Sequence, residues 1–214
     1  MRMTKAVLAM AVLVGALAGC ATVTVPETRV VTGRVTDESG APVAGNPVLL
    51  VARSLKLSAV RLEYDERGRR EVRTATDADG RFRIEFAPAS LGNNFFLFFY
   101  DVTGFDRIKY RRPEPLDITD RLSSNQAVVV NHVLQFEPSW AEVARQIARF
   151  GAESDRGRIL RQHGLPDKRD VPAGSGAEAE VWWYYADGVN YWFVGDRLTR
   201  TSQFPPMPRP APSR

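Results

Sequence analysis

The sequence is poor in the residues that most active sites need. It has 1 cysteine and 2 histidines in 214 residues, and a single cysteine excludes a disulfide within the chain. We find no nucleophile elbow, zinc-protease helix, phosphate loop or metal-ligand cluster. We therefore expect no catalytic residues, no metal and no cofactor. A hydrolase with two carboxylates stays open, because such a pair can come from any two positions in a sequence.

Long apolar runs are also absent, except at the start of the chain. There Arg2 and Lys5 precede an uncharged apolar run over residues 6–16. A membrane-spanning helix needs about 20 apolar residues. A short apolar run behind positive charges is instead typical of a cleaved export signal.

This run ends in four residues with a distinctive pattern: Leu17, Ala18, Gly19 and Cys20. They resemble the lipobox of bacterial lipoproteins, in which the thiol receives a diacylglycerol and the signal is cut just before it. The resemblance implies a signal peptide over residues 1–19, a lipid on Cys20 that attaches the chain to a membrane, and a location in the cell envelope. Ala21 is not the aspartate that retains such proteins in the inner membrane, which favours the outer membrane. The alternative is an ordinary secretory signal with a chance cysteine.

Charge gives little indication of a nucleic-acid partner. The chain has 29 basic and 25 acidic residues, so without Arg2 and Lys5 the balance is 27 against 25. Two groups of basic residues, around 67–70 and 107–112, could meet lipid head groups or lipopolysaccharide phosphate. Solvated loops are the favoured interpretation of both groups.

Residues 20–28 are predicted to be a tether, and residues 29–136 to be a β-sandwich. Residues 81–86 alternate apolar with charged side chains, which is the period of a strand with one buried face. The run 95–100 is apolar on both faces, as in a central strand, and residues 127–134 close the series. The connection 53–72 is long and highly charged. No helical pattern interrupts this part of the chain.

One turn in this region begins like a calcium loop. Asp77, Asp79 and Gly80 have the right spacing, but Pro88 stands where the loop needs a glutamate. We therefore expect a hairpin turn with Gly80 at positive φ.

Turn and strand residues of the sandwich carry a resemblance to a family: Gly33, Val35, Asp37, Gly40, Pro42, Val43, Gly45, Val48, Thr76, Asp77, Gly80, Phe82 and Ile84. They look like the carboxypeptidase regulatory-like domain, which has a transthyretin-like antiparallel sandwich. The resemblance implies a non-catalytic spacer or docking module.

Residues 137–204 change to a helical pattern and then return to strands. Ser139 and Glu142 have the spacing of a capping box, and a second helix is expected over residues 154–163, before Gly164. Three strands are expected, at 180–185, 190–194 and 197–202, and residues 205–214 form a Pro-rich tail. The fold class is mainly β, an antiparallel sandwich followed by a helix-helix-three-strand α+β domain.

The second domain resembles the SmpA/OmlA-type (BamE-like) lipoproteins of outer-membrane protein assembly, through Ile159, Leu160, Gly164, Pro166, Trp182, Tyr184, Tyr191, Phe193 and Leu198. The resemblance implies a binding module with an envelope protein as its partner.

The expected turns divide the aromatic residues of these strands between two faces. Tight turns at 187–188 and 195–196 place Tyr184 opposite Tyr191 and Trp183 opposite Trp192. One face is assigned to the helices as core: Trp182, Tyr184, Tyr191, Phe193 and Leu198. The other carries Trp183, Tyr185 and Trp192, the candidate partner-binding residues.

The predicted function is therefore a non-catalytic, lipid-anchored scaffold of the envelope. The alternative is a glycan or peptidoglycan-binding lipoprotein whose aromatic face stacks on sugars. Packing of this face on the chain's own sandwich is the structural alternative to both.

We expect Cys20→Ala to abolish acylation, because the substitution removes the thiol that receives the lipid. Intact-mass measurement of membrane-extracted protein checks this. A wild-type chain that lacks acyl mass and starts elsewhere than residue 20 would contradict the lipobox interpretation.

Overall fold

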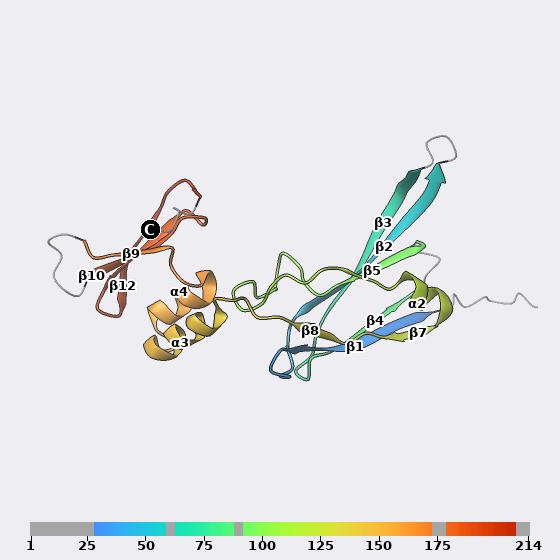
Figure 1. The fold of residues 1–214 in the computed structure, drawn as a ribbon, viewed down its shortest axis with the longest axis horizontal. Helices are drawn as coiled ribbons and strands as arrows, with labels where there is room; N and C mark the ends of the chain where they lie inside the picture. The colour runs from blue at the N-terminus through green and yellow to red at the C-terminus, as the bar shows by residue number, and fades with distance from the viewer. Residues whose placement is uncertain (1–27, 59–62, 88–91, 173–178, 209–214) are drawn as a thin grey trace, which may run out of the picture.

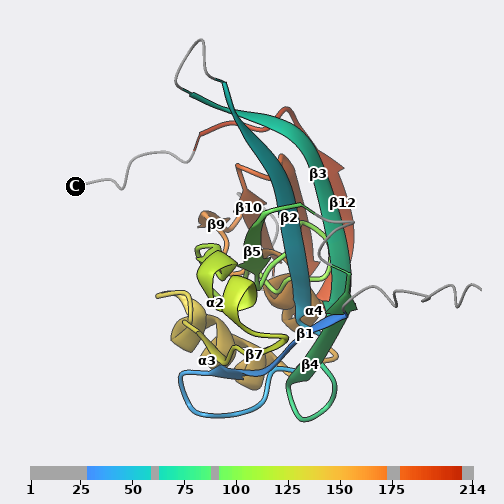
Figure 2. The same cartoon turned by 90° about the vertical axis from the view of Figure 1, so that its right-hand side faces the viewer.

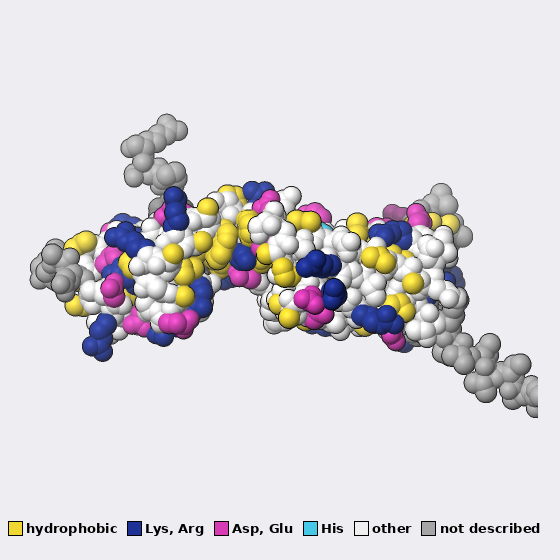
Figure 3. Space-filling view, turned by 90° about the horizontal axis from the view of Figure 1, so that it is seen from below, with side chains coloured by type: hydrophobic (Ala, Val, Ile, Leu, Met, Phe, Trp, Pro, Cys, Tyr) yellow, Lys and Arg dark blue, Asp and Glu magenta, His cyan; other side chains and the backbone are white. Residues whose placement is uncertain are grey.

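The computed structural model describes residues 28–58, 63–87, 92–172 and 179–208. It forms two lobes joined at a narrow junction (Figure 1), and hydrophobic side chains gather on the surface beside this junction (Figure 3). The predicted mainly β fold is confirmed: a sandwich is followed by a smaller α+β lobe. Residues 1–19, with the lipobox, and Cys20 lie outside the described residues. The helices within the described ranges are all too short or too polar to span a bilayer.

The first lobe consists of two sheets packed face to face. One sheet has the order β4-β1-β7, with β8 also beside β1, and the other has the order β3-β2-β5-β6. The elements are β1 (Arg29–Asp37), β2 (Pro47–Ser58), β3 (Glu63–Ala75), β4 (Arg81–Phe86), β5 (Asn94–Phe98), β6 (Leu116–Asp117), helix α2 (Thr119–Ser124), β7 (Ala127–Val129) and β8 (His132–Leu134).

The inward-facing positions of both sheets form the core of the sandwich. Along β4 the three apolar residues Phe82, Ile84 and Phe86 are buried, while the charged residues between them are exposed. Leu50 of β2 and Leu97 of β5 are fully buried in the same core. Burial of one face is the reason for the period-two pattern in the sequence.

Three details of the sandwich differ from the prediction. The last predicted strand is divided into β7 and β8, which pair with successive parts of β1. The short helix α2 occurs where no helical pattern was found, and it buries only Leu122. The charged connection 53–72 belongs mostly to β2 and β3, which pair with each other from Pro47↔Ala75 to Ser58↔Glu63.

The turn at Asp77 is structural, but it is not a hairpin. Gly80 has φ +74°, and the Asp77 carboxylate accepts hydrogen bonds from the amides of Asp79 and Arg81 at 2.9 and 2.8 Å. The turn joins β3 to β4, which lie in different sheets. The prediction of a hairpin was wrong because the strands on either side of a turn need not pair.

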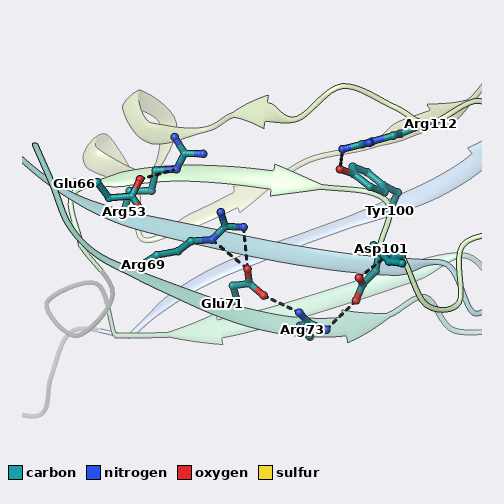
Figure 4. Close-up of polar contacts among 9 residues, drawn as sticks. Arg53, Glu66, Arg69, Glu71, Arg73, Tyr100, Asp101 and Arg112 are labelled. Atoms are coloured by element: carbon teal, nitrogen blue, oxygen red, sulfur yellow. Dashed lines mark hydrogen bonds and ion pairs between the residues drawn. The ribbon is translucent and has the colours of Figure 1, made fainter. Parts of the chain in front are cut away.

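Strand β3 is the edge of its sheet, and charged side chains line it (Figure 4). Glu71 pairs with Arg69 at 2.9 Å and with Arg73 at 2.8 Å, and Arg73 reaches Asp101 at 2.9 Å. The hydrogen bond from Arg73 is the main cause that lowers the pKa of Glu71. Such a row of charges discourages the free edge from pairing with another strand.

The second lobe packs two helices against one antiparallel sheet. Helices α3 (Trp140–Phe150) and α4 (Asp155–His163) precede the sheet, whose order is β12-β11-β10-β9. Its strands are β9 (Lys168–Asp170), β10 (Ala179–Tyr184), β11 (Val189–Val194) and β12 (Arg197–Gln203). The predicted three strands are present, and β9 adds a fourth at the start of the expected loop 168–178. Its three residues are charged, so their sequence carries no strand pattern.

Both helices begin where predicted, after Ser139 and after Ser154, but only one of the two starts has a capping hydrogen bond. The Ser154 hydroxyl accepts a hydrogen bond from the Gly157 amide, as an N-cap does. The Ser139 side chain makes no cap hydrogen bond. The capping box is therefore not formed, because Glu142 instead accepts from Arg145 and Gln146 on its own helix.

A buried arginine organises the core of the second lobe. Arg156 of α4 is 6% exposed. Its guanidinium lies 4.6 to 5.1 Å from the ring centres of Phe150, Trp182 and Phe193. It is neutralised by Glu180 and donates to the Gly195 carbonyl at 2.8 Å. A buried charge needs such partners to offset its loss of hydration.

The two lobes are joined by a loop of the sandwich as well as by the chain itself. Ile108, between β5 and β6, packs against the core of the second lobe. A Cβ built on Gly164 would lie 3.6 Å from Ile108 Cγ2, an ordinary van der Waals contact, so Ile108 lies directly against this residue. Arg107 reaches Asp187 at 3.6 Å, and the Lys109 ammonium lies 5.7 Å from the Trp140 ring centre. The interface is therefore small but varied in chemistry.

We expect Gly33→Ala to destabilise the sandwich. A Cβ at Gly33 of β1 would lie 1.7 Å from the Val130 carbonyl oxygen, and forcing an extra carbon into packed structure costs about 1–3 kcal/mol. The matched control is Gly68→Ala on β3, where nothing lies within 4 Å of the added carbon. Urea denaturation measures both variants, and equal midpoints would contradict the close approach of β1 to Val130.

Candidate functional site

The sheet of the second lobe presents aromatic residues on both of its faces. Trp182 and Trp183 are neighbours on β10, so their side chains point to opposite sides. On the helix side, Trp182, Tyr184 and Phe193 are buried, and Tyr191 and Leu198 pack against them. The predicted core face is confirmed.

The register of the β10–β11 hairpin differs from the prediction by two residues. Tyr184 pairs with Val189, Trp183 with Asn190 and Trp182 with Tyr191. The prediction of Trp183 opposite Trp192 was therefore wrong, because four residues form the turn rather than two. A shift of two preserves which residues share a face, since side chains alternate with a period of two. The pairing of Phe193 with Leu198 is as predicted.

The second face, which we call the aromatic face, carries Trp183, Tyr185 and Trp192 together with polar neighbours. Trp183 pairs with Lys168 on one side and with Asn190 on the other. The Trp192 indole N–H donates to Asn190 Oδ1 at 3.0 Å, and the Arg200 guanidinium lies 5.7 Å from the Trp192 ring centre.

Exposure on the aromatic face rises toward one end. Val181, which pairs with Trp192, is only 2% exposed. Val194, farther along β11 on the same face, is 51% exposed. The open part of this face is therefore the end at Val194, beside the half-buried Trp192.

Phe204, just before the predicted tail of residues 205–214, covers the other end of the aromatic face. The Phe204 ring lies 5.7 Å from the Trp183 ring centre and 6.3 Å from that of Tyr185. The Met207 amide donates to the Tyr185 carbonyl at 3.0 Å, so the first residues of the tail also lie against the sheet.

The sandwich does not cover the aromatic face. Helices α3 and α4 lie on the side of the sheet nearest the sandwich (Figure 1), so the opposite face is turned away from it. No extensive packing joins a described strand of the sandwich to β10, β11 or β12. The Trp183 indole nitrogen is buried and finds no hydrogen-bond partner among the described residues.

A second cluster of polar side chains lies at the junction of the lobes. His163, the last residue of α4, has its Nδ1 2.6 Å from Asp187 Oδ2 and its Nε2 2.8 Å from the Tyr191 hydroxyl. A cavity of about 420 Å³ adjoins His163 and is lined also by Arg107, Glu137 and Asp167. Helix position was the only explanation of His163 available from the sequence.

Asp187, His163 and Tyr191 form a short hydrogen-bonded chain, in which each ring nitrogen of His163 has one partner. Burial, and then the nearby Asp187 charge, raises the pKa of Tyr191, so its phenol stays protonated. His132, the other histidine, stacks on Phe99 with ring centres 4.2 Å apart, and burial lowers its pKa. The described residues contain no group of three or more side chains suited to hold a metal.

Comparison with known proteins gives weak similarity only. No family model matches the chain, and no curated protein does. A streptococcal ancillary pilin is 20% identical, with a TM-score of 0.32, over 54% of this chain and 34% of the pilin. The major pilin subunit of Bacillus cereus is 16% identical, with a TM-score of 0.32, over 51% of this chain and 30% of the pilin.

A hydroxyquinol 1,2-dioxygenase from Pseudomonas putida is similar over 51% of this chain, at 18% identity and a TM-score of 0.25. The chain spans about a third of the length of the streptococcal pilin and of the Bacillus cereus pilin. The pilin similarity accords with a β-rich fold and carries no argument about function.

We expect Phe204→Ala to lower the melting temperature and to shift tryptophan emission to longer wavelength. The substitution uncovers Trp183, and loss of a half-buried ring costs about 1–2 kcal/mol. Met207→Ala, at a 46% exposed side chain, is the control. If Phe204→Ala leaves both readouts unchanged, Phe204 does not pack on the aromatic face.

Proposed function

We propose that this protein is a lipid-anchored scaffold of the bacterial envelope that binds another protein through the open part of its aromatic face. The observation that carries the proposal is that this face stays partly open. The helices cover the other side of the sheet, the sandwich lies beyond the helices, and Phe204 covers only the end near Trp183.

In this proposal the sandwich acts as a spacer. Cys20 precedes β1, and the second lobe lies at the far end of the sandwich from the start of β1 (Figure 1). A lipid on Cys20 would therefore hold the second lobe away from the membrane. This is the role implied by the resemblance to carboxypeptidase regulatory-like domains. The resemblance of the second lobe to SmpA/OmlA-type lipoproteins points to outer-membrane assembly or maintenance as the setting.

The composition of the aromatic face suits a protein partner. Tryptophan, tyrosine and arginine dominate the residues that contribute most to protein interfaces, and Trp192, Tyr185 and Arg200 lie on this face or beside it. We propose no catalytic role for the chain, because its sequence carries none of the common catalytic motifs.

Glycan binding is the second candidate, because the rings on this face have polar neighbours. Asn190 and the Lys168–Asp170 ion pair, 2.9 Å apart, lie beside Trp183 and Trp192. Aromatic rings beside hydrogen-bonding groups also suit a sugar, so the two candidates need an experiment that separates them.

We expect Trp192→Ala to abolish partner capture while the protein stays folded, because the half-buried Trp192 lies beside the open end of the aromatic face. A photo-crosslinking residue at Val194, which is 51% exposed, reports capture in the native cell. The matched control is Val133→Ala on the sandwich, where the side chain is 53% exposed.

The outcomes separate the alternatives. Crosslinks to one protein that disappear in Trp192→Ala and persist in Val133→Ala support the proposal. Loss of binding to purified peptidoglycan in the same variant, without any protein crosslink, supports the glycan candidate instead. Global unfolding of Trp192→Ala would make the ring part of the core and contradict both.

A further inference from the structure

The hairpin formed by β2 and β3 continues beyond the sandwich as an arm. Strand β5 pairs with β2 only as far as Arg53↔Asn94. Among the strands, residues 54–58 pair only with β3, up to Ser58↔Glu63. The Asn93 side chain hydrogen-bonds the Leu55 backbone on the other side, at 2.9 and 3.1 Å, so residues 56–58 are the unsupported part. Figure 2 shows both strands rising past the rest of the lobe. A two-stranded ribbon without a third strand or a covering helix is marginally stable in water.

The arm ends in an exposed apolar pair. Leu57 and Tyr64 pair directly across the two strands, and their exposed fractions are 52% and 70%. Directly opposed residues lie on the same face of a ribbon. Leu55, two residues before Leu57, is on this face and is half-buried. Two of the acidic residues nearby are ion-paired: Asp65 with Arg67 at 3.2 Å, and Glu66 with Arg53 at 3.7 Å.

The arm lies at the same end of the sandwich as the start of β1. The antiparallel pairing and Figure 1 agree on this: Arg29 pairs with Phe86 at that end, and the arm extends toward it, opposite to the second lobe. Residues 20–28 connect Arg29 to Cys20, and nine extended residues span at most about 30 Å. The part of the arm beyond β5, residues 54–58, is about 16 Å long. A lipid on Cys20 would thus hold the tip of the arm within reach of the bilayer.

We propose that the tip of this arm rests on the lipid surface as a second membrane contact, through Leu57 and Tyr64. The inference depends on the proposed lipid anchor. A tyrosine with an apolar ring and a polar hydroxyl suits the boundary between head groups and acyl chains. Contact at two points would fix the tilt of the sandwich, and therefore the direction in which the aromatic face of the second lobe points.

The test uses the full acylated chain with one added cysteine. Tyr64→Cys carries an environment-sensitive fluorophore, because acylation blocks the Cys20 thiol. The chain is reconstituted into vesicles of phosphatidylethanolamine and phosphatidylglycerol with spin-labelled lipid. The matched control is Val102→Cys, at a 94% exposed residue that follows β5 at the other end of the sandwich. We expect lipid quenching at position 64 and none at position 102. Adding Leu57→Ser should reduce the quenching.

Each result bears on one of the two proposals. Acylated protein whose fluorophore at position 64 is as solvated as the one at position 102 overturns the membrane contact and leaves the anchor intact. A fluorophore at position 64 that is shielded without lipid, increasingly so with protein concentration, shows that a second copy covers the tip and also overturns the contact. A chain without acyl mass, in which Cys20 takes up a second label, overturns the anchor and the inference together.

Discussion

The alternation of side chains along β10 is the constraint on which the second lobe depends. Two tryptophans in succession cannot share a face of a strand. Trp182 enters the core, where Arg156 packs against its ring 5.1 Å away. Trp183 is left on the side that the helices do not reach. A sheet with helices on one side therefore has a second aromatic face that something else must cover, and Phe204 covers only part of it.

The junction between the lobes determines what this face can meet. Ile108 fits against Gly164, and Arg107 reaches Asp187, the same carboxylate that His163 binds. These contacts place the helices on the side toward the sandwich. The aromatic face is then turned outward, which removes the sandwich as its cover. A loop of the first lobe thus decides the accessibility of a surface on the second.

The sandwich separates two ends with different surfaces. The end at which β1 begins also bears the arm with Leu57 and Tyr64, and the opposite end bears the second lobe. Charged residues along β3 keep the long edge from pairing with another chain. Leu57 and Tyr64, farther along the β2–β3 arm, lie outside this row of charges. This distribution fits a spacer with a membrane-proximal end and a partner-binding end.

The sequence by itself determined the features that depend on local patterns. The alternation of side chains at 81–86 predicted β4. Ser154 and Gly164 predicted the bounds of α4. The division of the aromatic residues between two faces followed from the alternation of side chains along β10 and β11. The tertiary structure decided what depends on contacts between distant residues. These are the pairing of charged β9 with β10, the turn at Asp77 that joins two sheets, the Asp187–His163–Tyr191 cluster, and the packing of Phe204 on Trp183. A periodic pattern in the sequence reflects which face of a single strand or helix is buried. The other features depend on contacts between residues that are far apart in the sequence, and such contacts leave no periodic pattern.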